Sequence, residues 1–260
     1  MDIIQVSKTI LNYSYTLANI PLFFRSTLLR RKFGSYLKLN REIYDIFPGE
    51  SCFVLGGGPS LRKIPIHYLV NKKLITVNKL YQWDGFSELN PVAHCAIDPA
   101  MYVNETGERL YKEMCSREDT HFLISNNAPD KLLNLRNTYI ALLGYLPSSR
   151  ISPYDLSKPS AAFNNVVLYA IELAIYMGFR DIVLLGCDFN QFASRVESHA
   201  YSDSSSTARQ CTMTQDLLGH AIAILQHQFL YEFAKSKNVR ILNASEGSLL
   251  DVYPKLELTF

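Results

Sequence analysis

A short apolar run that ends in three glycines most constrains what this chain can fold into. Residues 52–55 read Cys-Phe-Val-Leu, and Gly56-Gly57-Gly58-Pro59-Ser60 follows directly. Such a run is typical of a buried strand, glycine accepts the backbone of a tight turn, and proline suits the first turn of a helix. A strand, a glycine turn and a helix start together predict an anion site built from free N–H groups. We therefore expect residues 56–60 to bind a nucleotide.

Two familiar nucleotide motifs do not fit this loop. Leu61 stands where the dinucleotide fingerprint requires its third glycine, and no Gly-Lys-Ser/Thr follows to make a P-loop. An NAD-dependent oxidoreductase is therefore a poor interpretation. An ordinary strand–turn–helix corner would also account for the glycines, because Gly and Pro are common turn residues.

Composition narrows the class of protein. The 260 residues are 48% hydrophobic and 19% charged, which predicts a globular chain with a sizeable core. A net charge of +2 gives no general attraction to nucleic acid. The five cysteines are scattered without a Cys-x-x-Cys pair, which favours reduced core thiols over disulfides or a metal site. No secretory signal is recognised at the N-terminus, so we expect a cytoplasmic protein.

Apolar runs alternate with helical patterns from residue 51 onward. We expect strands at residues 51–55, 73–77, 92–97, 120–125, 181–185 and 239–242, and long helices at residues 163–177 and 217–237. This alternation predicts a mostly parallel α/β sheet. We expect a single Rossmann-like domain over residues 49–260 and a helical segment over residues 1–48. Ligands of such sheets bind beyond the carboxyl ends of the strands, where the sequence places Asn78, Asp98, Asn126 and Asp188.

The N-terminal segment has its own character. Residues 3–24 hold one charged side chain, Lys8, but polar residues and Pro21 interrupt them, which argues against a membrane-spanning helix. Residues 23–33 interleave aromatic and aliphatic side chains with cations, a pattern that suits a membrane surface. Peripheral attachment to the inner membrane face is one expectation. Docking on this domain, or on a second subunit in a homo-oligomer, is the other.

Several motifs together resemble a known family. The loop Gly56–Leu61, Asn78 after a strand, and the run Gly178–Phe189, which ends Gly-Cys-Asp-Phe, come first. Ser198-His199-Ala200-Tyr201 and Gly247-Ser248-Leu249-Leu250 follow in the same order. This set resembles the family 42 bacterial sialyltransferases, and their wider group of motility accessory factor glycosyltransferases and hydroxymethylpterin pyrophosphokinase-like proteins. The resemblance covers residues 50–255.

The resemblance implies a function. The fold would bind a CMP-activated acidic sugar, either a sialic acid-like nonulosonic acid or Kdo, and transfer it to a surface glycan or lipid-linked acceptor. The transfer would invert the anomeric centre and need no metal or other cofactor. The sequence departs from the family pattern in four places. Gly57 and Asp98 replace asparagines, and Lys158-Pro159-Ser160-Ala161-Ala162 precedes the long helix in place of Thr-Ser-Gly. Asn190-Gln191-Phe192 stands directly after Phe189, where the family has tyrosines.

Roles for individual residues follow from this resemblance. His199 would be the general base, because a histidine titrates near neutral pH, and Tyr201 would steady the phosphate. The glycine-loop amides and the start of the 163–177 helix, with Ser160 and Asn164, would stabilise the leaving nucleotide. Asp188 would accept hydrogen bonds from the ribose or cytosine, and Ser248 would contact the nucleotide or the donor carboxylate.

Other interpretations stay open at this point. His220 and His227 lie seven residues apart on one helical face and are expected to pack or cap rather than react. A pterin-type pyrophosphokinase would use ATP and magnesium, and would need clustered carboxylates that the sequence does not reveal. A non-catalytic nucleotide-binding protein is the third alternative, because Gly57 removes a side-chain contact that the resembled family makes.

Overall fold

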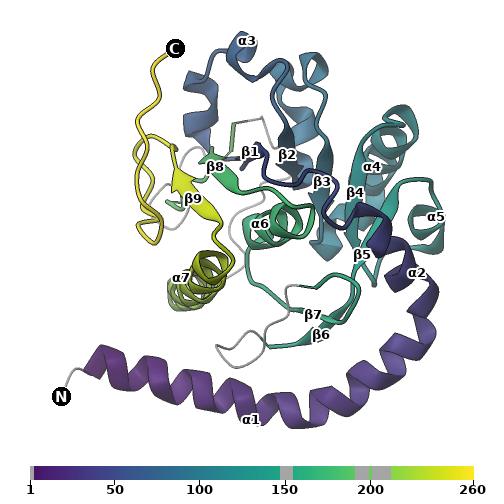
Figure 1. The fold of residues 1–260 in the computed structure, drawn as a ribbon, viewed down its shortest axis with the longest axis vertical. Coiled ribbons are helices and arrows are strands. Elements are labelled where there is room, and N and C mark those ends of the chain that lie inside the picture. Colours follow the sequence, from purple (N-terminus) through teal and green to yellow (C-terminus); the bar gives the residue numbers. More distant parts are fainter. Residues whose placement is uncertain (1–2, 147–154, 191–198, 201–211) are drawn as a thin grey trace.

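A parallel sheet with helices on both faces forms the body of the protein (Figure 1). The computed structural model describes residues 3–146, 155–190, 199–200 and 212–260. The strands are β1 (Ser51–Leu55), β2 (Leu74–Val77), β3 (Ala93–Ala96), β4 (His121–Ser125), β5 (Thr138–Ala141), β6 (Leu143–Tyr145), β7 (Ser160–Ala161), β8 (Asp181–Leu185) and β9 (Arg240–Asn243). The α/β fold predicted from the alternation of strands and helices is confirmed.

Seven of the strands form one sheet in the order β5-β4-β3-β2-β1-β8-β9. Every neighbouring pair is parallel, and β1 lies between β2 and β8 with Phe53 opposite both Leu74 and Val183. The chain runs outward from β1 to β5 and then returns to the other side of β1 with β8. The order therefore reverses between β1 and β8, and such a switch point is where open α/β sheets bind ligands.

Helices connect the strands. The α-helices are α1 (Ile3–Lys32), α2 (Gly34–Leu39), α3 (Ile66–Leu69), α4 (Asn104–Ser116), α5 (Asp130–Leu133), α6 (Val166–Tyr176) and α7 (Met213–Ser236). Short 3-10 helices are η1 (Asn40–Ile43), η2 (Pro59–Lys63), η3 (Asn78–Gln82), η4 (Asp84–Glu88) and η5 (Pro99–Tyr102).

Capping residues correct two predicted helix starts. Helix α6 begins at Val166 rather than residue 163, because the Asn165 side chain accepts the Val167 N–H at 2.8 Å and acts as the N-cap. Helix α7 begins at Met213 rather than residue 217, because Thr212 and Gln215 form a capping box.

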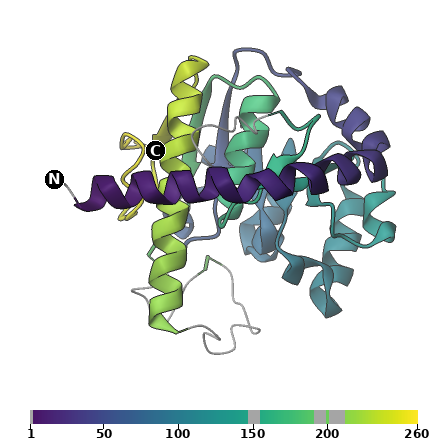
Figure 2. The same ribbon diagram turned by 90° about the horizontal axis from the view of Figure 1, so that it is seen from below.

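Helix α1 runs along the underside of the body (Figures 1 and 2) and contacts β6. It is one continuous helix with Pro21 inside it. The segment that follows is fixed to the sheet by Asn40, which is buried. Its side-chain amide donates to the carbonyls of Ile140 at 2.7 Å and Leu156 at 2.6 Å, and its Oδ1 accepts the Ile140 N–H at 3.1 Å. The boundary predicted between residues 48 and 49 stays a prediction.

No helix among the residues that the structure describes is both long and apolar enough to cross a bilayer.

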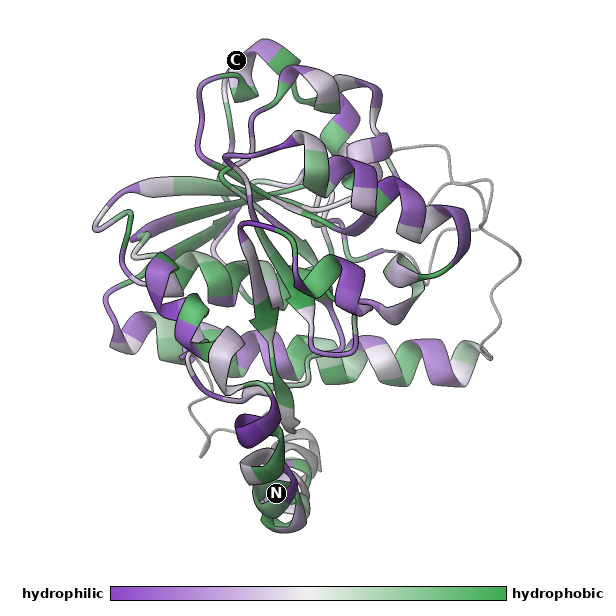
Figure 3. Ribbon diagram, turned by 90° about the vertical axis from the view of Figure 1, so that its right-hand side faces the viewer, coloured by the Kyte–Doolittle hydropathy of each residue, from purple (hydrophilic) through white to green (hydrophobic). Residues whose placement is uncertain are grey.

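The core lies on both faces of the sheet, and the apolar strands run through the interior (Figure 3). On one face Cys52 and Val54 pack with α6 and α7. On the other face Leu55 packs with the short helices η2 to η4, and Phe122 packs with α4 and α5. Strands buried on both faces need continuous apolar runs, which is why β1 and β8 were recognisable from the sequence.

Candidate functional site

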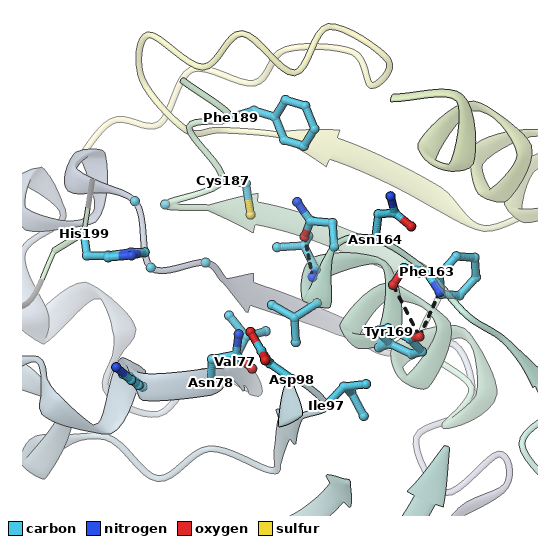
Figure 4. A pocket seen from close by; sticks show the side chains of 18 of the residues that line it. Val77, Asn78, Ile97, Asp98, Phe163, Asn164, Tyr169, Cys187, Phe189 and His199 are labelled. Atoms are coloured by element: carbon cyan, nitrogen blue, oxygen red, sulfur yellow. Dashed lines mark hydrogen bonds between the residues drawn. The ribbon is translucent and has the colours of Figure 1, made fainter. Parts of the chain in front are cut away.

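A cavity of about 610 Å³ opens where the sheet order reverses. The segments that follow β1, β2, β3 and β8 line it, together with the start of α6 and one side of α7 (Figure 4). Of the residues predicted to form the site, the structure brings eight to this lining: Gly56, Gly57, Gly58, Asn78, Asp98, Asn164, Asp188 and His199. Four others, Pro59, Ser60, Ser160 and Ser248, do not line it, and Tyr201 falls outside the described residues.

The glycines after β1 are required by the neighbouring loop after β8. A Cβ on Gly58 would lie 2.5 Å from the Asp188 carboxyl carbon and 2.6 Å from the Gly186 carbonyl oxygen. Gly186 has a φ of +63°, and its own Cβ would lie 2.6 Å from the Gly56 carbonyl oxygen. The two loops therefore approach closely enough that side chains are excluded on both. We predicted that the glycines let the backbone approach a ligand. In the structure they let the loop after β1 approach the loop after β8.

Most amides of the glycine loop already have partners. Gly56 N–H donates to Leu185 and Gly58 N–H to Gly186, each at 2.7 Å. Pro59 has no N–H, and the Ser60 N–H donates to the Asp188 carboxylate at 2.9 Å. Only the Gly57 amide lacks a partner within the part of the loop and its surroundings that the structure describes. The predicted anion site at the start of the helix after β1 is therefore corrected: η2 is a short 3-10 helix whose first amides are occupied.

Asp188 joins the same two loops. One carboxylate oxygen accepts the Ser60 N–H, and the other accepts a short hydrogen bond from the Ser60 hydroxyl. Asp188 is 5% exposed, and it lies at the edge of the cavity. Asp188 was predicted to accept hydrogen bonds from the ribose or cytosine, but in the structure its carboxylate binds Ser60. Ser60 was predicted to contact the nucleotide, but its hydroxyl points to Asp188.

Ser248 has a comparable structural role. Its hydroxyl donates to the Cys187 carbonyl at 2.7 Å and accepts from the Asn243 side-chain amide at 3.0 Å. These bonds tie the segment after β9 to the segment after β8. Ser160 lies in β7, fully buried away from the cavity, and its hydroxyl has no partner among the described residues.

The N-terminus of α6 faces the cavity. The lining includes Asn164, Asn165 and Val166, which are the residues where the helix begins. The Asn164 N–H donates to Gln226 of α7 at 2.8 Å. The Phe163 N–H donates to the Tyr169 hydroxyl at 2.8 Å (Figure 4). A helix N-terminus carries a partial positive charge, so this end of α6, rather than that of η2, favours an anionic ligand.

Asn78 and Asp98 lie beside one another on the opposite wall (Figure 4). Asn78 follows β2 with a φ of 45°, a conformation that asparagine tolerates. Its side-chain oxygen is buried and has no partner among the described residues. Asp98 follows β3 and accepts the Ala100 N–H at 2.9 Å, which caps η5. Polar atoms held in place at a cavity wall are suited to hydrogen-bond a ligand.

His199 lies at the glycine end of the cavity (Figure 4). Its position is fixed by backbone contacts on both sides. The His199 carbonyl accepts from the Arg62 guanidinium at 3.1 Å, and the next residue, Ala200, donates its N–H to the Gly57 carbonyl at 2.7 Å. The imidazole therefore enters the cavity from a segment attached to the glycine loop.

Two further histidines, His220 and His227, line the cavity from α7, although both were expected to pack or cap rather than react. His220 is 18% exposed, and its Nδ1 lies 2.8 Å from the Asp216 carbonyl oxygen and 3.4 Å from the Asp216 carboxylate. An acid and a carbonyl that orient an imidazole at Nδ1 are the arrangement that holds many general bases in place. The seven-residue spacing did place His220 and His227 on one helical face, but nothing local indicated that this face meets the cavity.

His227 is fully buried at the rear of the cavity. Its Nδ1 lies 2.8 Å from the Tyr253 hydroxyl, and its Nε2 has no partner among the described residues. Burial lowers the pKa of His227 to about 3, so the imidazole is neutral at pH 7. Cys187 also lines the cavity, and burial raises the pKa of its thiol to about 12. A thiol held neutral in this way is not a nucleophile.

No group of three or more His, Cys, Asp or Glu side chains that could hold a metal ion occurs within the described ranges.

The sequence matches no protein-family model and no curated protein. Among solved structures, the fold is similar to that of the sialyltransferase CstII from Campylobacter jejuni in complex with CMP. The TM-score is 0.51 at 18% identity, over 80% of this chain and 85% of that chain. A CstII variant in complex with CMP gives a TM-score of 0.51 at 16% identity, over 80% and 86% of the two chains.

A glycosyltransferase of the motility accessory factor type from Magnetospirillum magneticum also matches, with a TM-score of 0.51 at 12% identity. It covers 82% of this chain and 35% of that one, so this chain corresponds to about a third of that protein. The fold of the chain is thus that of these sialyltransferase and motility accessory factor structures.

Proposed function

We propose that this protein is a glycosyltransferase that moves an acidic sugar, a sialic acid-like nonulosonic acid or Kdo, from a CMP-activated donor to a glycan or lipid-linked acceptor. The observation that carries the proposal is the cavity at the β1/β8 switch point, in a fold similar to that of a sialyltransferase solved with CMP. Its volume of about 610 Å³ is in the range of small-molecule sites.

The polar groups of the cavity suit such a donor. The N-terminus of α6 and the Gly57 amide offer N–H groups to a phosphate. Asn78 and Asp98 supply side-chain acceptors on the opposite wall, which suit the amino group of cytosine and the ribose hydroxyls. Lys79, also on the lining, adds a cation near a ligand that carries several negative charges.

The reaction would be a direct displacement. An acceptor hydroxyl attacks the anomeric carbon of the sugar while the bond to the CMP phosphate breaks, and CMP departs with the bonding electrons. The hydroxyl proton passes to a general base. His199 and His220 both lie on the cavity lining. His199 is the base that the resemblance implies, and His220 is favoured by its geometry, because Asp216 orients it.

A ligand screen tests the donor class. Thermal denaturation with CMP, CDP, ATP plus magnesium, or NAD should show stabilisation by the cytidine nucleotides. Stabilisation by ATP plus magnesium alone would favour a pyrophosphokinase. A panel of CMP-activated acidic sugars would then identify the donor by release of CMP. Activity that survives EDTA would support the proposed metal-independent transfer, and loss of activity that added magnesium restores would exclude it.

Paired histidine variants distinguish the two bases. His199→Ala and His220→Ala should each keep the affinity of the wild-type protein for CMP, because the nucleotide is held by other groups. If the replaced histidine is the general base, the rate of sugar transfer should fall by about a hundredfold or more. If both variants turned over normally, neither histidine would be the base. If both lost CMP binding, the loss of activity would report on binding and not on proton transfer.

A further inference from the structure

Helix α1 packs on the body with a mixed side, on which two buried polar residues lie among half-buried apolar ones such as Leu22 and Leu29. Asn19 and Ser26 are 5% and 1% exposed, although they belong to a helix on the surface. The Asn19 side chain exchanges two hydrogen bonds with the Leu146 backbone, at 2.9 and 2.7 Å, and the Ser26 hydroxyl lies 2.6 Å from the Tyr145 hydroxyl. Polar contacts of this kind fix the rotation of the helix about its own axis.

The opposite side of α1 is apolar and exposed. Leu17 is two residues from Asn19, which is about 200° around a helix, so it points away from the body. Six large side chains at spacings of three and four form this outward stripe, with exposures from 49% for Tyr13 to 69% for Phe24: Ile10, Tyr13, Leu17, Ile20, Phe24 and Leu28. A surface helix ordinarily turns its apolar face inward, so α1 is oriented to meet something outside this chain.

The charges on α1 are all of one sign. From residue 9 to its end at Lys32 the helix carries Arg25, Arg30, Arg31 and Lys32 and no acidic residue. All four cations are exposed and lie in the last two turns, beside the end of the outward stripe. A helix that combines an apolar face with cations alone suits the boundary between anionic headgroups and acyl chains.

We infer that α1 lies flat on an anionic phospholipid bilayer, with the outward stripe in the acyl boundary and the four cations among the phosphates. The charge pattern decides between this occupant and a second copy of the chain. Helices that pair through apolar stripes commonly add ion pairs of opposite sign along the seam, and α1 has no carboxylate to offer its copy. The polar residues on its inner side, Asn19 and Ser26, keep it on the surface of the body.

The arrangement of the body permits this contact. A helix of 30 residues is about 45 Å long, and α1 lies across the near face of the molecule in the view from below (Figure 2). Strand β6 holds α1 through Tyr145, and Leu143 at the other end of the same strand lines the cavity. Bilayer contact through α1 would thus keep the cavity close to the membrane surface, whichever ligand the cavity takes.

Vesicle flotation of the full chain tests the inference. The wild-type protein should bind vesicles containing about 30% phosphatidylglycerol much more tightly than vesicles of phosphatidylcholine alone. Binding should weaken as salt rises from about 50 mM to about 500 mM, because salt screens the cations. Leu17→Glu and Phe24→Glu should each lower the partition coefficient at least about tenfold. R30A/R31A removes two of the four cations and should reduce the preference for anionic vesicles by about tenfold or more.

Val103→Glu is the matched control, because Val103 is a 53% exposed apolar residue outside α1, and it should leave binding unchanged. Circular dichroism should show all variants folded, since the replaced side chains are exposed. Wild-type protein that fails to bind anionic vesicles overturns the inference without any variant. A concentration-dependent dimer by light scattering that Leu17→Glu converts to monomer, with no vesicle binding, would assign the stripe to a second copy.

Discussion

Glu172 offers the sharpest test of how the core is built. It lies in the middle of α6 with 0% of its surface exposed, and neither carboxyl oxygen has a partner among the described residues. Burial raises the pKa of this carboxyl well above its ordinary value of 4.5, because the charged form would lose its hydration without gaining a partner. The proton on Glu172 is therefore bound more tightly in the native state than in the unfolded state.

This difference in proton binding determines whether the free energy of unfolding rises or falls with pH. Between pH 4.5 and the native pKa of Glu172, the unfolded chain has released this proton and the native chain retains it. The unfolded state then binds fewer protons, so the contribution of Glu172 to the free energy of unfolding falls by about 1.4 kcal/mol for each pH unit. The decrease stops at the native pKa. Glu172→Gln cannot titrate, so the variant lacks this slope.

Urea denaturation of both proteins from about pH 5 to about pH 8 measures the effect. At every pH in this series that lies below the native pKa of Glu172, the free energy of unfolding of Glu172→Gln minus that of the wild-type protein should rise by about 1.4 kcal/mol per pH unit. Other titrating groups are common to both proteins and cancel. Glu105→Gln is the control, because its side chain is 89% exposed, and its difference from wild type should stay nearly flat. A flat difference for Glu172→Gln as well would refute a buried, unpartnered carboxyl.

Three further predictions concern the site and its support. Gly58→Ala should lower the free energy of unfolding by about 1–3 kcal/mol in urea titrations, because its methyl group would overlap the Asp188 carboxyl group. Asn40→Ala should cost a similar amount, since three hydrogen bonds to buried backbone groups are lost, and Asn40→Gln should not restore them, because its longer side chain displaces the amide from all three partners. His227 should destabilise the protein as pH falls from 6.5 toward 3, by about 1.4 kcal/mol per pH unit, because the unfolded imidazole binds a proton that the native one excludes. The stability of His227→Gln should lack that part of the acid dependence.

Local patterns predicted the elements of the sheet with little error where the strands are apolar on both faces. The bounds of β1 and β8 agree with the prediction, because each is a run of four apolar residues that follows one polar residue and ends next to glycine. Strands β5, β6 and β7 were missed. Strand β7 has only two residues, and it exists because it pairs with β6, which lies about fifteen residues away behind an intervening segment.

The site was predicted less completely than the fold because its residues act across long sequence distances. The need for glycine at position 58 is set by Gly186 and Asp188, about 130 residues later, so a single-sequence interpretation could only suggest a ligand. His220 was discounted for a similar reason. Its spacing from His227 shows that they share a helical face, but whether that face is core or cavity depends on how α7 crosses α6.

The contacts between loops divide the cavity into a fixed part and an adaptable part. The end after β1 is held by the Gly58–Gly186 backbone bond, by the Ser60–Asp188 bonds and by the Ala200–Gly57 bond, and none of these needs a ligand. A rigid frame of this kind keeps the shape of this end of the cavity fixed in the free protein. Under the proposed function, discrimination between donors would arise at the walls, where the Asn78 side-chain oxygen has no partner among the described residues. Asn78→Gly, which accepts the positive φ of this position, should therefore weaken CMP binding in a calorimetric titration while leaving the melting temperature of the free protein nearly unchanged. Unchanged affinity would show that this wall does not contact the nucleotide.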